Sequence, residues 1–532
     1  MVARSNTNSV DVQRAAAGTF IVDWGDGKAE VIKKTTATNA TYSHTYSTNG
    51  TYIVGWRGRP TTYASPTAAI HFYNVNDSHT KVKSITGNLS KVFPTINGAN
   101  PSFNGTFRET NITEIPNELF ADLSGAPVPH MFRSTFEGCN ALTGSIPDQL
   151  FGNVSGAPTE YMFLNTFANC TGLSGSIPAG LFAGISGAPA IYMFQSTFNG
   201  CTGLSGPIPT NLFGGISGAP ADYMFNATFR GCTGLSGSIP SGLFGNITGA
   251  PAHSMFLNTF SGCTNLTGAI PAGLFGNISG PAKTSMFNST FSNCNNITGP
   301  IPTGLFGNIT GTPQVSMFYG VFNNCHSLTG SIPVGLFGNT SGAPADNMYT
   351  SAFTGCYELS GEIPSRLFGN LYGAPATNMF NATFTNCHNL TGSIPSGLFG
   401  NLSGAPADYM FRRTFDGCTG LTGEIPPDLF GDIVGKPANG MFRNTFASCS
   451  GLTGEIPPKL FGNISGAPTM DMFYATFSGC SGLTGTIPEN LFGIISGAPA
   501  QGLFFGTFNT CSELTGAIPP NLSGSTSGQP QY

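Results

Sequence analysis

The feature that most constrains this chain is a cysteine that recurs at every thirty-first position without a single exception. A period of roughly 20 to 50 residues is typical of arrays in which each unit buries its apolar face only by stacking on its neighbours. A constant interval also indicates that the contacts between turns tolerate no inserted residue. The thirteen positions are Cys139, Cys170, Cys201, Cys232, Cys263, Cys294, Cys325, Cys356, Cys387, Cys418, Cys449, Cys480 and Cys511.

The turn that starts at Cys232 illustrates the first half of the pattern. Leu235 and Ile239 are separated by serines and a glycine, at the spacing of a short strand with one buried face and one hydroxyl face. This segment is the predicted stacking strand. Phe244 points inward, and Gly245 then starts a predicted polar loop.

The second half of the turn allows two interpretations. Met255, Phe256, Thr259 and Phe260 recur at the spacing of a helical stripe, which predicts a helix of about ten residues. A second strand over the same residues is the alternative, because Phe256 and Phe260 would also share one face of a strand. In either case the Phe, Leu and Ile columns of stacked turns form the predicted core.

The motif Thr-Phe-x-x-Cys-x-x-Leu-x-Gly-x-Ile-Pro-x-x-Leu-Phe, seen from Thr228 to Phe244, resembles leucine-rich repeats, most closely the BspA-like bacterial surface class. Leu421 to Pro426 also resembles the plant-type repeat. Units in both families have about 23 or 24 residues, so most turns of this chain carry an additional stretch, Gly-Asn-Ile-Ser-Gly-Ala-Pro. The resemblance implies adhesins, receptor-like modules and other interaction surfaces rather than enzymes.

The array is predicted to occupy residues 96–526 and to have about fourteen turns, since an incomplete turn at Phe107 and 112–120 precedes the first cysteine. The predicted fold class is a leucine-rich-repeat-like solenoid with one short strand and one short helix per turn. A small all-β sandwich is predicted before it, and residues 527–532 form a predicted tail.

Residues 1–95 differ from the array in composition and charge. Residues 1–100 hold ten Lys and Arg against five acidic residues, about +5, and the rest of the chain is about −10. Short apolar runs broken by Gly-Asp-Gly and Asn-Gly turns predict antiparallel strands. The stretches 23–27, 44–46 and 50–54 resemble the polycystic-kidney-disease (PKD) domain, an immunoglobulin-like sandwich. Asp23 and Asp26 suit either a calcium site or a turn cap, and the turn cap is favoured.

The cysteine column suggests buried free thiols. Thirteen is odd, and equivalent side chains of stacked turns point the same way, which is poor geometry for a disulfide. Each turn supplies one sulfur and no recurring histidine, so no metal site is expected. No catalytic constellation recurs, so neither an enzyme nor a cofactor is expected.

Two polar columns offer further functions. Seven turns carry Asn-x-Ser/Thr at one register, which suits either a row of glycans or asparagines in a loop. They are Asn153, Asn246, Asn277, Asn308, Asn339, Asn401 and Asn463. A Thr/Ser column, which includes Thr267 and Thr329, predicts stacking hydrogen bonds; ice binding is the less favoured alternative.

The composition of the chain excludes several fold classes and several kinds of partner. Charged residues make up 8% of the chain and hydrophobic residues 40%, which excludes helical bundles and general disorder. The net charge of −5 gives no reason to expect nucleic acid. Neither a membrane span nor a secretion signal is expected.

The predicted function is that of an extracellular or cell-surface structural and adhesive protein. Its predicted partners are other copies of itself, assembled head to tail into filaments, or a surface protein or glycan. A phage or virion tail fibre that binds a host receptor is the alternative.

Overall fold

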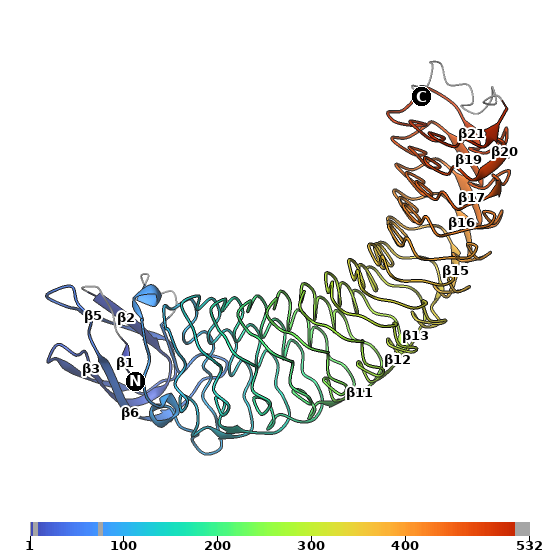
Figure 1. Cartoon of the computed structure of the whole chain (residues 1–532). Coiled ribbons are helices and arrows are strands. Elements are labelled where there is room, and N and C mark those ends of the chain that lie inside the picture. The colour runs from blue at the N-terminus through green and yellow to red at the C-terminus, as the bar shows by residue number, and fades with distance from the viewer. Residues whose placement is uncertain (1, 4–8, 73–77, 517–532) are drawn as a thin grey trace. The chain divides into compact units, whose positions relative to one another are not determined.

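The computed structural model describes residues 2–3, 9–72 and 78–516. It shows a β-solenoid of about fourteen turns with a period of about 31 residues, preceded by small antiparallel sheets (Figure 1). The chain forms two compact units, Met1–Thr248 with Asn258–Leu266, and Gly249–Leu257 with Thr267–Tyr532. The solenoid prediction is confirmed. The boundary near residue 95 stays a prediction, and the predicted tail at 527–532 lies outside the described residues, as does 517–526.

The N-terminal part contains two antiparallel sheets. One has the order β1 (Val2–Ala3), β6 (Val54–Thr62), β3 (Ala17–Asp23) and β4 (Ala29–Lys34), and the other has the order β5 (Ala40–Thr45), β2 (Ser9–Arg14) and β7 (Ile70–His71). Phe20 and Val22 are buried in β3 between exposed neighbours, as the alternating pattern predicts. The guanidinium of Arg14 lies 3.7 Å from the centroid of the Phe20 ring, which joins the two sheets.

The segment 23–28 is a turn stabilised by its own aspartates. The Gly25 N–H donates to Asp23 Oδ1 at 3.0 Å, and the Lys28 N–H donates to Asp26 Oδ1 at 3.1 Å. The Oδ2 atom of Asp26 lies 2.8 Å from Nε2 of His44. These contacts are those of turn caps, the favoured interpretation of the two residues.

The first turn of the solenoid is covered by the N-terminal sheets. The Ala69 N–H donates to the Ser102 oxygen at 2.8 Å, and the Phe72 N–H donates to the Thr106 oxygen at 3.0 Å. The short helices η1 (Ser78–Lys81) and α1 (Leu89–Val92) lie between these segments in the sequence. Within the described ranges these two are the only helices, and neither has the length or apolar character needed to cross a membrane.

The predicted helix in each turn is wrong, and so is the alternative strand. The segment is a ribbon of consecutive tight turns, so the repeat is not the strand-and-helix unit of a leucine-rich-repeat-like fold. The Thr166 N–H donates to the Phe163 oxygen three residues back at 3.2 Å, whereas the Phe167 N–H donates to the Thr197 oxygen of the next turn at 2.9 Å. Every fourth residue has a left-handed backbone, for example Asn165 and Asn169 with φ of 56° and 61°.

The same backbone pattern occurs where the helix was predicted at residues 255–260. Ser254, Asn258 and Gly262 have φ values of 49°, 56° and 76°. An α-helix requires right-handed φ throughout and hydrogen bonds between residues four apart. Phe256 and Phe260 share a face because the ribbon repeats every four residues, a spacing close enough to 3.6 to resemble a helical stripe in the sequence.

The predicted stacking strand pairs in parallel between turns, mostly through a single bridge such as Gly206 with Leu235. Near the C-terminal end this row becomes a three-stranded sheet. Its strands are β18 (Gly454–Glu455), β20 (Leu483–Thr486) and β22 (Leu514–Thr515).

The predicted polar loop instead forms a second row of parallel strands. In the first unit β8 (Ser124–Gly125) pairs with β9 (Asn153–Val154), and β10 (Ser217–Gly218) pairs with the first two residues of β11 (Asn246–Gly249), whose last residue belongs to the second unit. In the second unit the strands are β12 (Asn277–Pro281), β13 (Asn308–Thr310), β14 (Ser341–Gly342), β15 (Asn370–Gly373), β16 (Asn401–Gly404), β17 (Asp432–Gly435), β19 (Asn463–Gly466) and β21 (Ile494–Ile495). The loop prediction failed because a buried Ile, Leu or Val alternates with exposed polar neighbours, which is a strand pattern of very short length.

The core of each unit consists of stacked side chains from equivalent positions. Ring centroids in the three Phe columns are 5.3 Å apart for Phe163 and Phe194, 5.6 Å for Phe167 and Phe198, and 5.6 Å for Phe182 and Phe213. The Leu and Ile columns are also buried. Both units therefore present regular outer surfaces on a rigid, repetitive core.

Candidate functional site

The cysteine column lies inside the solenoid and stabilises it. All thirteen thiols are free, twelve are buried and Cys511 is partly exposed. The Sγ of Cys170 donates to the Phe136 oxygen of the preceding turn at 3.0 Å. Burial raises the pKa of the Cys201 thiol to about 12, because desolvation disfavours the thiolate. Neutral buried thiols react poorly as nucleophiles or metal ligands.

A threonine column reinforces the same contacts. The Oγ1 of Thr197 lies 3.1 Å from the Phe163 oxygen of the preceding turn and 2.9 Å from the Phe194 oxygen of its own turn. The Thr-Phe-x-x-Cys motif thus supplies one hydroxyl and one thiol for hydrogen bonds between turns. In the part of the chain that the structure describes, no group of three or more His, Cys, Asp or Glu is arranged to hold a metal ion.

The seven predicted asparagines lie on the outer face of the second strand row. Six begin strands and Asn339 lies two residues before β14; all seven are exposed. Strand register places Asn246 opposite Ser217 and Asn308 opposite Ser279 of the preceding turn. An alternating strand with a polar outer face places polar residues two positions apart, so strand pairing accounts for the spacing of the Asn and the Ser/Thr in this motif. Glycosylation stays a prediction.

The predicted hydroxyl column is exposed on the first strand row. Thr267 and Thr329 both face solvent, and the Thr329 N–H donates to the Gly299 oxygen of the preceding turn at 3.0 Å. Glycine follows each hydroxyl because the backbone there is left-handed, with φ of 74° at both Gly268 and Gly330. A methyl group at Gly454 would come within 2.7 Å of Cγ of Glu424.

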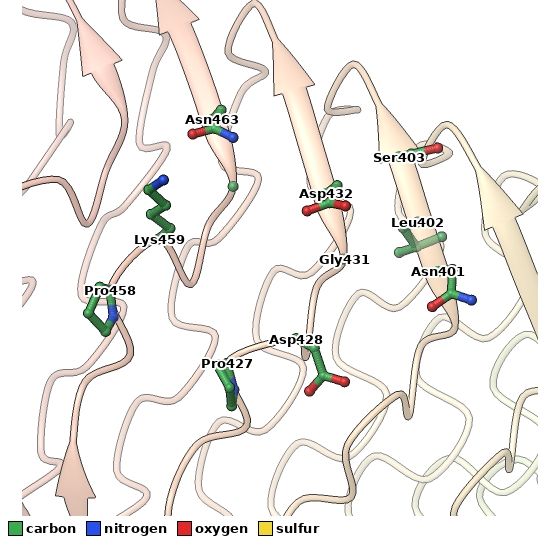
Figure 2. A pocket seen from close by; sticks show the side chains of 11 residues that line it. Asn401, Leu402, Ser403, Pro427, Asp428, Gly431, Asp432, Pro458, Lys459 and Asn463 are labelled. Carbon is green, nitrogen blue, oxygen red and sulfur yellow. The ribbon is translucent and has the colours of Figure 1, made fainter.

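A polar groove of about 540 Å³ crosses three turns of the second unit and brings two of the predicted asparagines together. Figure 2 shows Asn401, Asp432 and Asn463 at the starts of β16, β17 and β19. The connecting segments before β17 and β19 carry Asp428 and Lys459, respectively, each after a proline.

Several residues of the groove differ from those that most turns carry at the same positions. Asp432 stands at a position that is Asn in eight other turns, and Lys459 stands at a position that is Gly in six. Lys459 has a left-handed backbone with φ of 64°, a conformation that costs a residue with a Cβ about 1 kcal/mol or more. Arg366 occupies the same column and also has a left-handed backbone, with φ of 58°.

Two large exposed side chains flank the groove on the same strand face. Tyr372 and Val434 occupy a column that is Ser or Thr in every other turn, and they are 53% and 43% exposed. Register places Tyr372 opposite Asn401 and Val434 opposite Asn463. Side chains at opposed positions share one face about 5 Å apart, so these residues border the groove.

One carboxylate in the groove is held in place. The Oγ of Ser396 donates to Oδ2 of Asp428 at 2.6 Å. Asp432 and Asn401 add acceptors, and the amide groups and Lys459 add donors. With two carboxylates and one ammonium, the groove has a net charge of −1. This arrangement suits an uncharged ligand rich in hydrogen-bonding groups.

Sequence reasoning found Asn401 and Asn463 but missed Tyr372, Asp428, Asp432, Val434 and Lys459. The sequence did carry a signal for these five residues, since each differs from the residue that is most common at its position of the repeat.

No protein-family model matches the chain, and a search of curated proteins finds no match. The resemblances to leucine-rich repeats and to the PKD domain therefore stay predictions.

Proposed function

We propose that this protein is an extracellular or surface-exposed structural and adhesive repeat protein. The observation that carries the proposal is the combination of a repetitive, buried core with an outer strand row whose Ser/Thr column is interrupted only by Tyr372 and Val434, beside one groove. A scaffold whose turns differ chiefly on the outside is suited to presenting a binding surface. The array itself supplies rigidity.

The sequence resemblances support the same function. The Phe-x-x-Cys-x-x-Leu and Ile-Pro motifs are similar to those of BspA-like surface proteins. The stretches 23–27, 44–46 and 50–54 are similar to a PKD domain, which is common in extracellular proteins. Free, buried thiols agree with this function because they lie out of reach of an oxidising environment. In this proposal the partners are a surface protein or glycan, or other copies of the chain.

Charge supports assembly between copies. The first 100 residues carry about +5 and the remainder about −10, so the N-terminal part of one copy attracts the array of another. Such a heterologous contact does not close and produces filaments. A phage or virion fibre would use the same architecture.

The proposal is tested by locating the protein on intact particles. Cells or virions of the source are treated with a protease that does not penetrate them, and the full-length chain is followed with an antibody. We expect the chain to be degraded while an internal marker protein stays intact. Protection of the chain until the particles are lysed would contradict a surface location.

A further inference from the structure

We propose that the groove around Asp432, together with the exposed ring of Tyr372, is a binding site for a neutral oligosaccharide. The inference rests on the proposed function, since it names the ligand class of a surface adhesin. It follows from the polar lining of the groove and from Tyr372 and Val434, the two large side chains that interrupt the Ser/Thr column beside it.

The polar groups of the groove match the chemistry of sugar hydroxyls. A hydroxyl both donates and accepts, so neighbouring hydroxyls of a sugar ring need acceptors and donors side by side. The Asp432 carboxylate supplies acceptors. The amides of Asn401 and Asn463, on the strands either side, supply both kinds of group, and the Lys459 ammonium supplies donors.

Apolar side chains at the edge of the groove match the C–H groups on the face of a sugar ring. Carbohydrates carry C–H groups that gain from leaving water against an aromatic or apolar surface. Tyr372, 53% exposed, lies opposite Asn401 in the strand register, so one ligand can contact both. Pro427 and Pro458 line the groove on its other side.

Charge selects against anionic ligands and divalent cations. The net charge of −1 in the groove disfavours sialylated or sulfated glycans and other anions. The ammonium of Lys459 among the lining groups disfavours a divalent cation. The volume of about 540 Å³ lies in the range of roughly 300 to 1,000 Å³ that is typical of small-molecule sites.

The repeat itself supplies variants that preserve the fold. Asp432→Asn, Tyr372→Ser and Lys459→Gly each introduce the residue that other turns carry at the same position. Lys459→Gly also relieves the left-handed backbone strain, so lower binding with unchanged or higher stability would separate recognition from folding. Val334→Ser and Asn308→Ala are matched controls, since both residues are exposed in the same unit outside the groove.

The experiment applies the full chain to an array of neutral, sialylated and sulfated oligosaccharides and then measures the strongest neutral ligand by calorimetry. We expect neutral glycans to bind and Asp432→Asn and Tyr372→Ser each to weaken binding about 10- to 100-fold, the worth of a charged hydrogen bond or a stacked ring. The two controls should bind as the wild type does.

Three results would overturn the inference: binding of anionic glycans alone, equal binding by the groove variants, and calcium binding that is lost in Asp432→Asn while no glycan binds. Each leaves the surface location intact. Conversely, glycan binding by a protein that proves inaccessible on intact particles would refute the proposed function but not this site.

Discussion

The Sγ of Cys201 donates a hydrogen bond to the backbone oxygen of Phe167, 34 residues earlier, at 2.9 Å. The same bond recurs between successive turns, with distances of 2.9 to 3.1 Å. The cysteine column is thus part of the hydrogen bonding between turns and not a reservoir of disulfides.

Thiol reactivity tests this role. Because twelve thiols are buried, native protein should react slowly with Ellman's reagent, with Cys511 reacting first. Denaturation without reductant should release all thirteen. A total of one thiol after denaturation would instead indicate six disulfides.

Alkaline pH should destabilise the solenoid. Burial raises the folded pKa of Cys201, Cys263 and Cys356 to about 12 from the ordinary value of 9.0. A group whose folded pKa is raised contributes stability that is fully present below the unfolded pKa. That stability is lost as the pH rises from 9 towards 12. Each such thiol should lower the free energy of unfolding by about 1.4 kcal/mol per pH unit in this window.

The measurement is the denaturant midpoint, followed by circular dichroism between pH 7 and pH 10. The window from 9 to 10 reports mainly thiols, because most tyrosines ionise at higher pH. An unchanged midpoint between pH 8 and pH 10 would contradict the buried, hydrogen-bonded thiols described above.

The threonine column predicts a stabilising substitution. Val321 is fully buried at a position where most turns have Thr. Val321→Thr places a hydroxyl beside the Phe287 and Phe318 oxygens, by analogy with Thr197, and should add about 1 kcal/mol to the free energy of unfolding. The reverse change, Thr197→Val, should remove about as much. Urea unfolding measures both, and a destabilised Val321→Thr variant would show that the hydroxyl finds no acceptor there.

Assembly through opposite charges should depend on salt. At low ionic strength the full chain should form filaments visible by negative-stain microscopy, and about 0.5 M salt should weaken them because the Debye length falls well below 10 Å. Deleting residues 1–95 should abolish the filaments. A chain that stays monomeric by light scattering at high concentration and low salt would contradict assembly.

The solenoid, its period and its core columns follow from the sequence alone. Cysteines at every thirty-first position require equivalent contacts in every turn, and columns of Phe, Leu and Ile are apolar enough to be buried wherever the backbone runs. Neither inference depends on the backbone conformation within the turn.

The backbone of the turn was decided by tertiary structure. Met255 to Phe260 has a spacing that suits a helix, but alternate N–H groups of the ribbon bond to a neighbouring turn, and every fourth residue is left-handed. Local propensity cannot report hydrogen-bond partners that lie a whole turn away along the chain. For the same reason the short segment after each Gly, which has too few residues for a strand on its own, becomes a strand through pairing.

The candidate site depends on a two-residue offset in the register between strands of successive turns, which the sequence alone does not reveal. Asn370 and Asn401 are equivalent positions of successive repeats, yet strand pairing joins Asn401 to Tyr372, which lies after Asn370 by two positions. This offset keeps the same side chains on the outer face, because strand side chains alternate with a period of two. It also places the third residue of one strand beside the first residue of the next. The departures Tyr372 and Asp432 were therefore visible in the sequence, but only the register of the stacked strands places Tyr372 beside Asn401, at the edge of the groove that Asp432 lines.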